Sequence, residues 1–223
     1  MERIPEPELM EDAAQARAYA AADFEAPHSM FVEAFRARFP GFDVHGHVLD
    51  LGCGPGDIAI RFAEAFPDCA VHGLDGAAAM LAEGERAVRE CGLERRVHLL
   101  HGLFPGAKLP CERYDVLISN SPLHHLHTPQ VLWLEVKHRA RPGAPVFIMD
   151  LARPDSPERA RAMVDTYAAD EPEILRRDFH HSLLAAFRPD EVRAQLREAG
   201  LEHLQVEVLS DRHLLVHGRA SVA

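Results

Sequence analysis

The chain has 223 residues, of which 47% are hydrophobic and 26% charged, a balance typical of globular proteins rather than disordered or fibrous ones. A formal net charge of −11 at pH 7 disfavours a nucleic-acid partner, because phosphate backbones repel an acidic protein. No apolar run approaches the ~18 residues of a membrane span. The acidic first thirty residues also lack the apolar stretch of a secretory signal. We expect one large cytoplasmic domain with no membrane partner.

The four cysteines, Cys53, Cys69, Cys91 and Cys111, stand 16, 22 and 20 residues apart. This spacing contains no close pair that would hold zinc or form a redox-active dithiol. We therefore expect reduced and mostly buried thiols.

Residues 8–39 predict one or two helices, with several phenylalanines available for packing. From residue 46 to residue 153, apolar strands alternate with amphipathic helices, which is typical of a parallel sheet covered on both faces. Asp57 is expected to cap the first helix of this region. The predicted strands are 47–51, 70–75, 97–101, 114–120 and 146–151, and the predicted helices are 57–66, 77–90 and 129–141.

The alternation ends after residue 153, where residues 155–187 predict irregular helical structure without a strand. A helix over 189–200 precedes two strands, 204–209 and 213–216, whose short connection requires an antiparallel hairpin. The predicted fold class is α/β: a doubly wound, mostly parallel seven-stranded sheet ending in that hairpin. Its expected parts are an N-terminal helical lid (1–45), a core of alternating strands and helices (46–153), a helical insert (154–188) and a closing helix and hairpin (189–223).

A glycine-rich turn, Asp50-x-Gly52-x-Gly54-x-Gly56, follows the first predicted strand. Its bare backbone lets a ligand approach the N-terminus of the next helix. A dinucleotide fingerprint would place a third glycine at position 57, where Asp57 stands instead. Carboxylates on both sides of the turn favour an ammonium group over a phosphate. Asp75, at the end of the second strand, can accept hydrogen bonds from ribose hydroxyls. These residues predict a pocket for a nucleoside joined to an amino acid.

The chain resembles the class I S-adenosylmethionine-dependent methyltransferases in four motifs, in order: 48–57, 73–75, 114–120 and 141–143. The resemblance implies S-adenosylmethionine as cofactor and S-adenosylhomocysteine as product. Many relatives carry an acid after the glycine at Gly102, where this chain has Leu103, so we expect apolar packing around adenine. The implied cofactor-binding residues are Asp50, Gly52, Gly54, Gly56, Asp75, Gly76, Met80, Gly102, Leu103, Phe104 and Asn120.

The loop after the fourth predicted strand faces the same crevice as the glycine turn. Its His124 and His125 are the candidate catalytic residues, because a neutral imidazole can take a proton from a methyl acceptor, although either side chain could merely line the pocket. The segment Asn120-Ser121-Pro122-Leu123 only half resembles the Asn-Pro-Pro-aromatic signature of enzymes that methylate planar amino groups. Methylation of adenine is therefore not expected.

Two segments outside the sheet are predicted to form the acceptor pocket and a lid. The candidate substrate-binding residues are Tyr19, Phe24, His28, His180 and His181. Deleting residues 1–40 is expected to abolish turnover or acceptor binding while the sheet stays folded. The histidine clusters have no evident carboxylate or cysteine partner at ligand spacing, so no metal site is predicted.

The function predicted from the sequence is methyl transfer from S-adenosylmethionine to a small-molecule acceptor by in-line displacement, for which positioning supplies much of the acceleration. Two alternatives stay open: a protein or RNA methyltransferase, and a non-catalytic sensor or scaffold that binds S-adenosylmethionine. The sequence identifies neither the acceptor and its receiving atom nor the oligomeric state.

Overall fold

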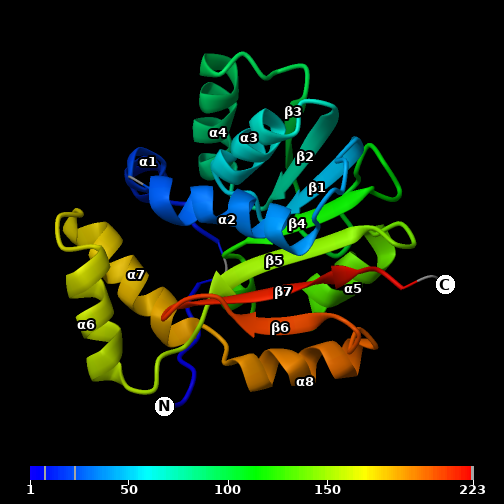
Figure 1. Ribbon diagram of the computed structural model, residues 1–223. Coiled ribbons are helices and arrows are strands. Elements are labelled where there is room, and N and C mark those ends of the chain that lie inside the picture. Colours follow the sequence, from blue (N-terminus) through cyan, green and yellow to red (C-terminus); the bar gives the residue numbers. More distant parts are fainter. Residues whose placement is uncertain (8, 23, 222–223) are drawn as a thin grey trace.

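The computed structural model describes residues 1–7, 9–22 and 24–221. Within this part of the chain, seven strands form one sheet in the order β3-β2-β1-β4-β5-β7-β6 (Figure 1). Only β7 runs against its neighbours, β5 and β6, and the other pairs are parallel, which confirms the predicted fold class. The strands are β1 (Gly46–Leu51), β2 (Cys69–Asp75), β3 (Val97–His101), β4 (Val116–Asn120), β5 (Pro145–Leu151), β6 (Gln205–Val208) and β7 (His213–Arg219).

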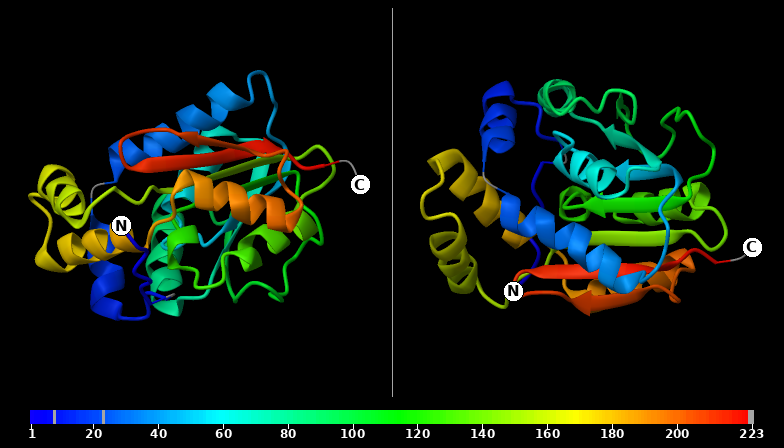
Figure 2. Two further views of the ribbon diagram at one scale, coloured as in Figure 1. Left: turned by 90° about the horizontal axis from the view of Figure 1, so that it is seen from below. Right: turned by 45° about the horizontal axis from the view of Figure 1, so that its top comes forward.

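Helices cover both faces of the sheet, as Figures 1 and 2 show. One face is covered by α2 (Glu25–Arg38), α3 (Asp57–Ala65) and α4 (Ala78–Glu90), and the other by α5 (Gln130–Arg139) and α8 (Pro189–Ala199). On the α5 side, the buried indole of Trp133 donates a hydrogen bond to Gln195 Oε1 at 3.0 Å, which joins α5 to α8. The alternating β and α segments of the sequence thus produce a three-layer sandwich.

The helix α2 is part of the hydrophobic core. Phe31 and Phe35 are fully buried against the sheet, and the Phe31 ring meets Phe147 of β5 edge to face with centroids 4.9 Å apart. Phe35 makes a similar contact with Phe62 of α3, also at 4.9 Å. The burial of α2 argues against a lid role for this part of residues 1–45 and against a sheet that stays folded after deletion of residues 1–40, since removal of α2 would uncover one face of the sheet.

Three further helices gather beyond the carboxyl ends of the parallel strands. They are α1 (Ala13–Ala21), α6 (Pro157–Tyr167) and α7 (Glu173–Ala185) (Figure 1). The first packs on α4 through Ala16 and Met80, and the other two form a small core of their own that includes Met163 and Leu183. None of the helices in the described ranges is long and apolar enough to cross a bilayer.

Some local details differ from the sequence-based expectations. Gly56, in the left-handed conformation with φ 76°, is the N-cap of α3, whereas Asp57 is its first helical residue and caps nothing. The Asp57 carboxylate is instead bound by His28 and Arg61. Strand β4 begins at Val116, because Tyr114 has only an isolated bridge to Ala140. Residue 8, where the predicted N-terminal helical region starts, lies outside the described residues.

Candidate functional site

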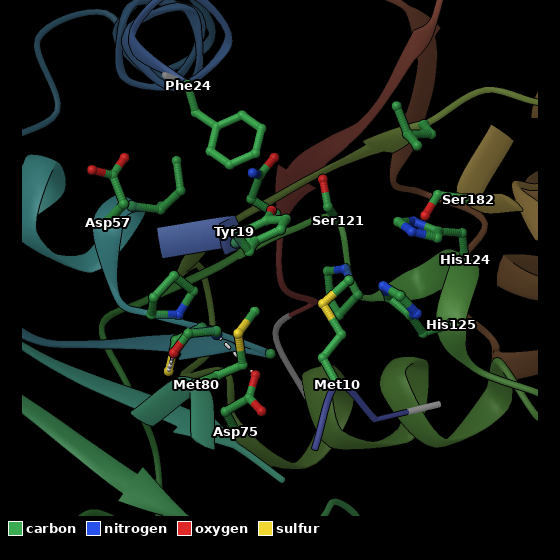
Figure 3. A pocket seen from close by; sticks show the side chains of 18 of the residues that line it. Met10, Tyr19, Phe24, Asp57, Asp75, Met80, Ser121, His124, His125 and Ser182 are labelled. Atoms are coloured by element: carbon green, nitrogen blue, oxygen red, sulfur yellow. Dashed lines mark hydrogen bonds between the residues drawn. The ribbon is translucent and has the colours of Figure 1, made fainter. Parts of the chain in front are cut away.

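A cavity of about 780 Å³ lies at the carboxyl ends of β1, β2, β4 and β5. The sheet order reverses between β1 and β4, and parallel α/β sheets bind ligands at such a reversal because the loops diverge there. Figure 3 shows Asp75 and Met80 on one side of this space and His124, His125 and Ser182 on the other. The volume lies within the ~300–1,000 Å³ typical of small-ligand sites.

Asp75, at the end of β2, fixes the conformation of the glycine turn after β1 through a hydrogen bond. Gly54 donates its backbone N–H to Asp75 Oδ2 at 2.8 Å, and Ala77 donates to Oδ1 at 2.7 Å. Each carboxylate oxygen can accept two hydrogen bonds, so both retain capacity for a ligand hydroxyl. Gly52, with φ 70°, has no room for a side chain, since a Cβ there would lie 2.4 Å from Pro122. The turn therefore presents bare backbone to the cavity.

Asp50 lines the same cavity and lacks a counter-ion. Its side chain is 1% exposed, and neither carboxylate oxygen has a hydrogen-bond partner among the described residues. Burial and the neighbouring charge of Asp75 raise the pKa of Asp50 to about 8. A buried, unpaired carboxylate is costly, and a ligand ammonium would supply the missing partner.

The predicted adenine side of the cavity is lined by Gly76, Met80, Gly102, Leu103 and Phe104. Leu103 is 62% exposed, so its side chain has apolar surface left to cover a ligand. A Cβ at Gly76 would lie 2.5 Å from Leu103 and 2.8 Å from Leu9. Leu9 and Met10 of the N-terminal segment also line this region, a contribution that sequence patterns did not indicate.

The predicted acceptor residues divide into two groups. Tyr19, Phe24 and His28 line the cavity, and their rings form a row with centroids 4.7 Å and 5.1 Å apart. Within this row, His28 Nδ1 lies 2.5 Å from Asp57 Oδ2. The row comes from α1 and the start of α2, so the N-terminal helices contribute side chains to the lining of the cavity.

His180 and His181 do not line the cavity. The lining residues of α7 are Leu175, Asp178, Phe179 and Ser182, which recur at helical spacing on one face. The two histidines fall outside that stripe, and His181 is exposed. Gly56 is also absent from the lining, because it caps α3 and packs near Leu99. Asn120 does line the cavity, and its Oδ1 has no partner among the described residues.

The histidine end is built on the short 3-10 helix η1 (Leu123–His125) after β4. Asp150 of β5 accepts hydrogen bonds from the Leu123 backbone N–H at 2.8 Å and from His124 Nδ1 at 2.6 Å. Both Asp150 and His124 are buried. Burial alone would lower the pKa of His124, but the charge and hydrogen bond of Asp150 raise it. Burial lowers the pKa of His125 to about 3, with the charge of His124 acting in the same direction.

Glu6, from the N-terminal segment, faces both histidines. Its Oε1 lies 3.5 Å from His124 Nε2 and 3.4 Å from His125 Nδ1. Arg3 anchors this segment by donating hydrogen bonds to the backbone oxygens of His124, Leu126 and Ala185. Sequence reasoning missed both Asp150 and Glu6. Asp150 could have been found as an acid near the end of a predicted strand, but no local signal marks Glu6.

Comparisons with known proteins agree with this geometry. Residues 48–143 match a family described as "Methyltransferase domain". The chain is 44% identical over 91 residues to a trans-aconitate 2-methyltransferase of Klebsiella pneumoniae, covering 39% of this chain and 32% of that protein. It is 36% identical over 99 residues to a ribosomal protein uL3 glutamine methyltransferase of Burkholderia pseudomallei, covering 42% and 32%.

Each of these alignments covers less than half of the curated relative, so the similarity is to one part of that relative and not to its whole length. A solved structure of a SAM-dependent methyltransferase from Aquifex aeolicus shares the fold at a TM-score of 0.66 and 18% identity, over 93% of this chain and 98% of that one. The sheet order, the glycine turn and these matches converge on one assignment. The chain carries a methyltransferase domain over residues 48–143 and has the fold of a solved SAM-dependent methyltransferase.

Proposed function

We propose that the protein transfers a methyl group from S-adenosylmethionine to a small-molecule acceptor. The observation that carries this proposal is the shared cavity, which is lined by the carboxylates Asp50 and Asp75 and by His124 and His125. Figure 3 shows Asp75 on one side of it and the two histidines on the other. Methyl transfer to an acceptor needs donor and acceptor in line, and one cavity with two chemically distinct ends would allow that arrangement.

The donor side fits the cofactor in charge and shape. Asp50, buried without a counter-ion, would pair with the cofactor's ammonium group, and Asp75 would accept hydrogen bonds from the ribose hydroxyls through its remaining lone pairs. The adenine would rest among Gly76, Met80 and residues 102–104, which are backbone and apolar surfaces. The bound cofactor supplies an electrophilic methyl group on a sulfonium sulfur.

The acceptor side combines apolar walls with a polar end. Tyr19 and Phe24 would pack on an apolar part of the acceptor, while His124 and His125 face its receiving atom. That atom must present a lone pair to the methyl carbon as the carbon–sulfur bond breaks. An unprotonated imidazole nitrogen can assist by taking the acceptor's proton or by binding a cation that favours the deprotonated acceptor.

A small acceptor is favoured over a protein segment. The N-terminal segment lies across the histidine end, where Glu6 and Arg3 contact the η1 turn, and α7 adds Phe179 and Ser182. The relative named as a uL3 glutamine methyltransferase favours a protein acceptor as the second candidate. However, Ser121 has φ 64°, which proline cannot adopt, so this turn cannot carry the Asn-Pro-Pro signature in its present conformation.

Two measurements test the proposal. Calorimetry should show binding of S-adenosylmethionine and S-adenosylhomocysteine but not of NAD, and Asp75→Ala should weaken that binding.

In the second measurement, the protein and cofactor carrying a labelled methyl group are incubated with the small-molecule, protein and RNA fractions of a cell extract, one fraction at a time. Label in the small-molecule fraction supports the proposal. Label in protein or RNA identifies the macromolecular alternative, and tight cofactor binding without transfer to any fraction identifies a sensor or scaffold.

A further inference from the structure

Three potential metal ligands that no part of the proposed cofactor site uses meet at the histidine end of the cavity: His124 and His125 line it, and Glu6 lies beside them. We infer that Glu6, His124 and His125 bind a divalent transition-metal ion of the zinc class. One ligand atom from each of these side chains lies within 4.8 Å of the others. Two imidazoles and one carboxylate form a His₂Glu set, which is a known ligand set of catalytic zinc sites.

The distances favour a cation between these groups over direct hydrogen bonds. Charge-assisted hydrogen bonds measure about 2.7–2.9 Å, whereas Glu6 Oε1 lies 3.5 Å from His124 Nε2 and 3.4 Å from His125 Nδ1. This oxygen is buried and has no hydrogen-bond partner among the described residues. Ligand atoms placed tetrahedrally at ~2.0–2.1 Å from zinc are about 3.3–3.4 Å apart. The two separations between Glu6 and the histidine nitrogens match that spacing.

Asp150 prepares His124 for metal binding. Its Oδ1 lies 2.6 Å from His124 Nδ1, which places the ring proton on that nitrogen and leaves the Nε2 lone pair facing Glu6. Histidine ligands commonly donate their second N–H to a carboxylate in this way, and the arrangement fixes the ring orientation. Asp150 is held in turn by the Leu123 backbone N–H. It is a positioning residue and not a ligand.

The surroundings are compatible with a cation. His125 Nδ1 also lies 3.3 Å from the Pro7 backbone oxygen, so metal binding requires His125 to carry its proton on Nε2. The nearby Arg3 guanidinium is occupied by backbone oxygens, including that of His124. Magnesium and calcium prefer sets of oxygen ligands, whereas imidazole suits zinc, copper, iron and nickel. The ligand chemistry therefore favours a zinc-class ion.

A tetrahedral ion held by these three side chains would have a fourth position for another ligand, and the use of that position rests on the proposed function. An acceptor hydroxyl or thiol would coordinate there and release its proton to solvent, because a bound cation stabilises the anionic form. Its lone pair would then form the bond to the methyl carbon while the carbon–sulfur bond breaks, giving the methylated acceptor and S-adenosylhomocysteine. This assigns the acceptor to hydroxyl- or thiol-containing molecules able to bind a metal.

The test measures zinc binding by the full, untagged chain after chelator treatment. Competition with a chromophoric chelator gives the affinity for Zn²⁺, and the absorption of bound Co²⁺ reports the coordination. We expect about one equivalent of metal with a tetrahedral cobalt spectrum. Glu6→Gln and His125→Gln should each weaken zinc binding at least about 100-fold, more than loss of an outer-shell partner. The matched controls Glu2→Gln and His45→Gln, both at exposed positions, should bind zinc like the parent.

The proposal is overturned if the parent binds zinc no more tightly than His125→Gln, or if the control substitutions cause an equal loss. Cofactor affinity and thermal unfolding of every variant show whether it is folded, and Glu6→Gln keeps the size of the side chain in a segment outside the sheet. Intact binding of S-adenosylmethionine without zinc binding would remove only the metal site. Absence of cofactor binding by the parent would instead reject the proposed function, whatever the zinc result.

Discussion

The carboxylate of Asp75 accepts the backbone N–H of Gly54 at 2.8 Å, so the end of β2 fixes the shape of the turn that follows β1. Its other oxygen accepts the N–H of Ala77 and thereby holds the start of α4. One side chain thus connects two loops that both line the cavity. The same carboxylate is therefore both a structural element of the cradle and a candidate cofactor ligand.

Replacing Asp75 by alanine should weaken the binding of S-adenosylmethionine by roughly 1–3 kcal/mol, because the ribose hydroxyls lose their acceptors. The thermal midpoint should also fall, since two backbone donors lose their partner. Isothermal calorimetry of the parent, Asp75→Ala and the control Asp68→Ala, an exposed acid just before β2, checks this. Equal affinity in all three proteins would exclude Asp75 from the cofactor site.

Asp50 should make the protein less stable as the pH rises. Its ordinary pKa of 3.8 applies to the unfolded chain, and burial raises the pKa in the folded chain to about 8. Between these values the native state holds a proton that the unfolded state has lost. As the pH rises through this range, Asp50 therefore lowers the free energy of unfolding by up to ~1.4 kcal/mol per pH unit. The loss is complete above pH 8.

The isosteric change Asp50→Asn removes this titration and tests it. Urea unfolding at several pH values from 4 to 9 should show the variant gaining stability relative to the parent as the pH increases. The variant should bind S-adenosylmethionine more weakly than the parent, because the ammonium group of the cofactor loses its counter-ion. Stability curves that run parallel across the pH range would contradict the assignment of a raised pKa to Asp50.

Ser121 should tolerate glycine but not proline. Its φ of 64° is unfavourable for residues with a side chain, and its backbone N–H donates to Met149 O at 2.9 Å. Ser121→Pro forbids this angle and removes the hydrogen bond, so we expect a loss of about 3 kcal/mol or more. Ser121→Gly relieves the backbone strain and should change stability by no more than about +1 kcal/mol. Thermal unfolding checks both, and a stable Ser121→Pro variant would show that the turn has another accessible conformation.

Two N-terminal deletions should behave differently. Removing residues 1–10 takes away Arg3 and Glu6 but leaves the core residues Phe31 and Phe35, so cooperative unfolding should persist while acceptor turnover falls. Removing residues 1–40 also deletes both phenylalanines, each worth about 3–5 kcal/mol when buried. That shorter chain should not unfold cooperatively by circular dichroism. Unchanged turnover without residues 1–10 would show that the segment takes no part in the reaction.

The sequence alone determined the layered α/β sheet and the gathering of the glycine turn and Asp75 at one cavity. The apolar run before Gly52, the amphipathic segment after Gly56 and the acid that ends β2 are local signals, and parallel strands necessarily bring their carboxyl ends to one edge of the sheet. Asp50, Gly54 and Asp75 could therefore be assigned to one pocket without coordinates.

The tertiary structure decided which residues surround the histidine end of the cavity. A helix with a phenylalanine stripe can cover the sheet or close the pocket, depending on which apolar surface no other helix covers. For α2, that surface is the face of the sheet that contains Phe147. Likewise, the face that α7 turns toward the cavity excludes His180 and His181. Glu6 and Asp150 meet His124 from distant parts of the chain. No local sequence pattern predicts such contacts between distant residues, because they depend on how the layers of the fold pack together.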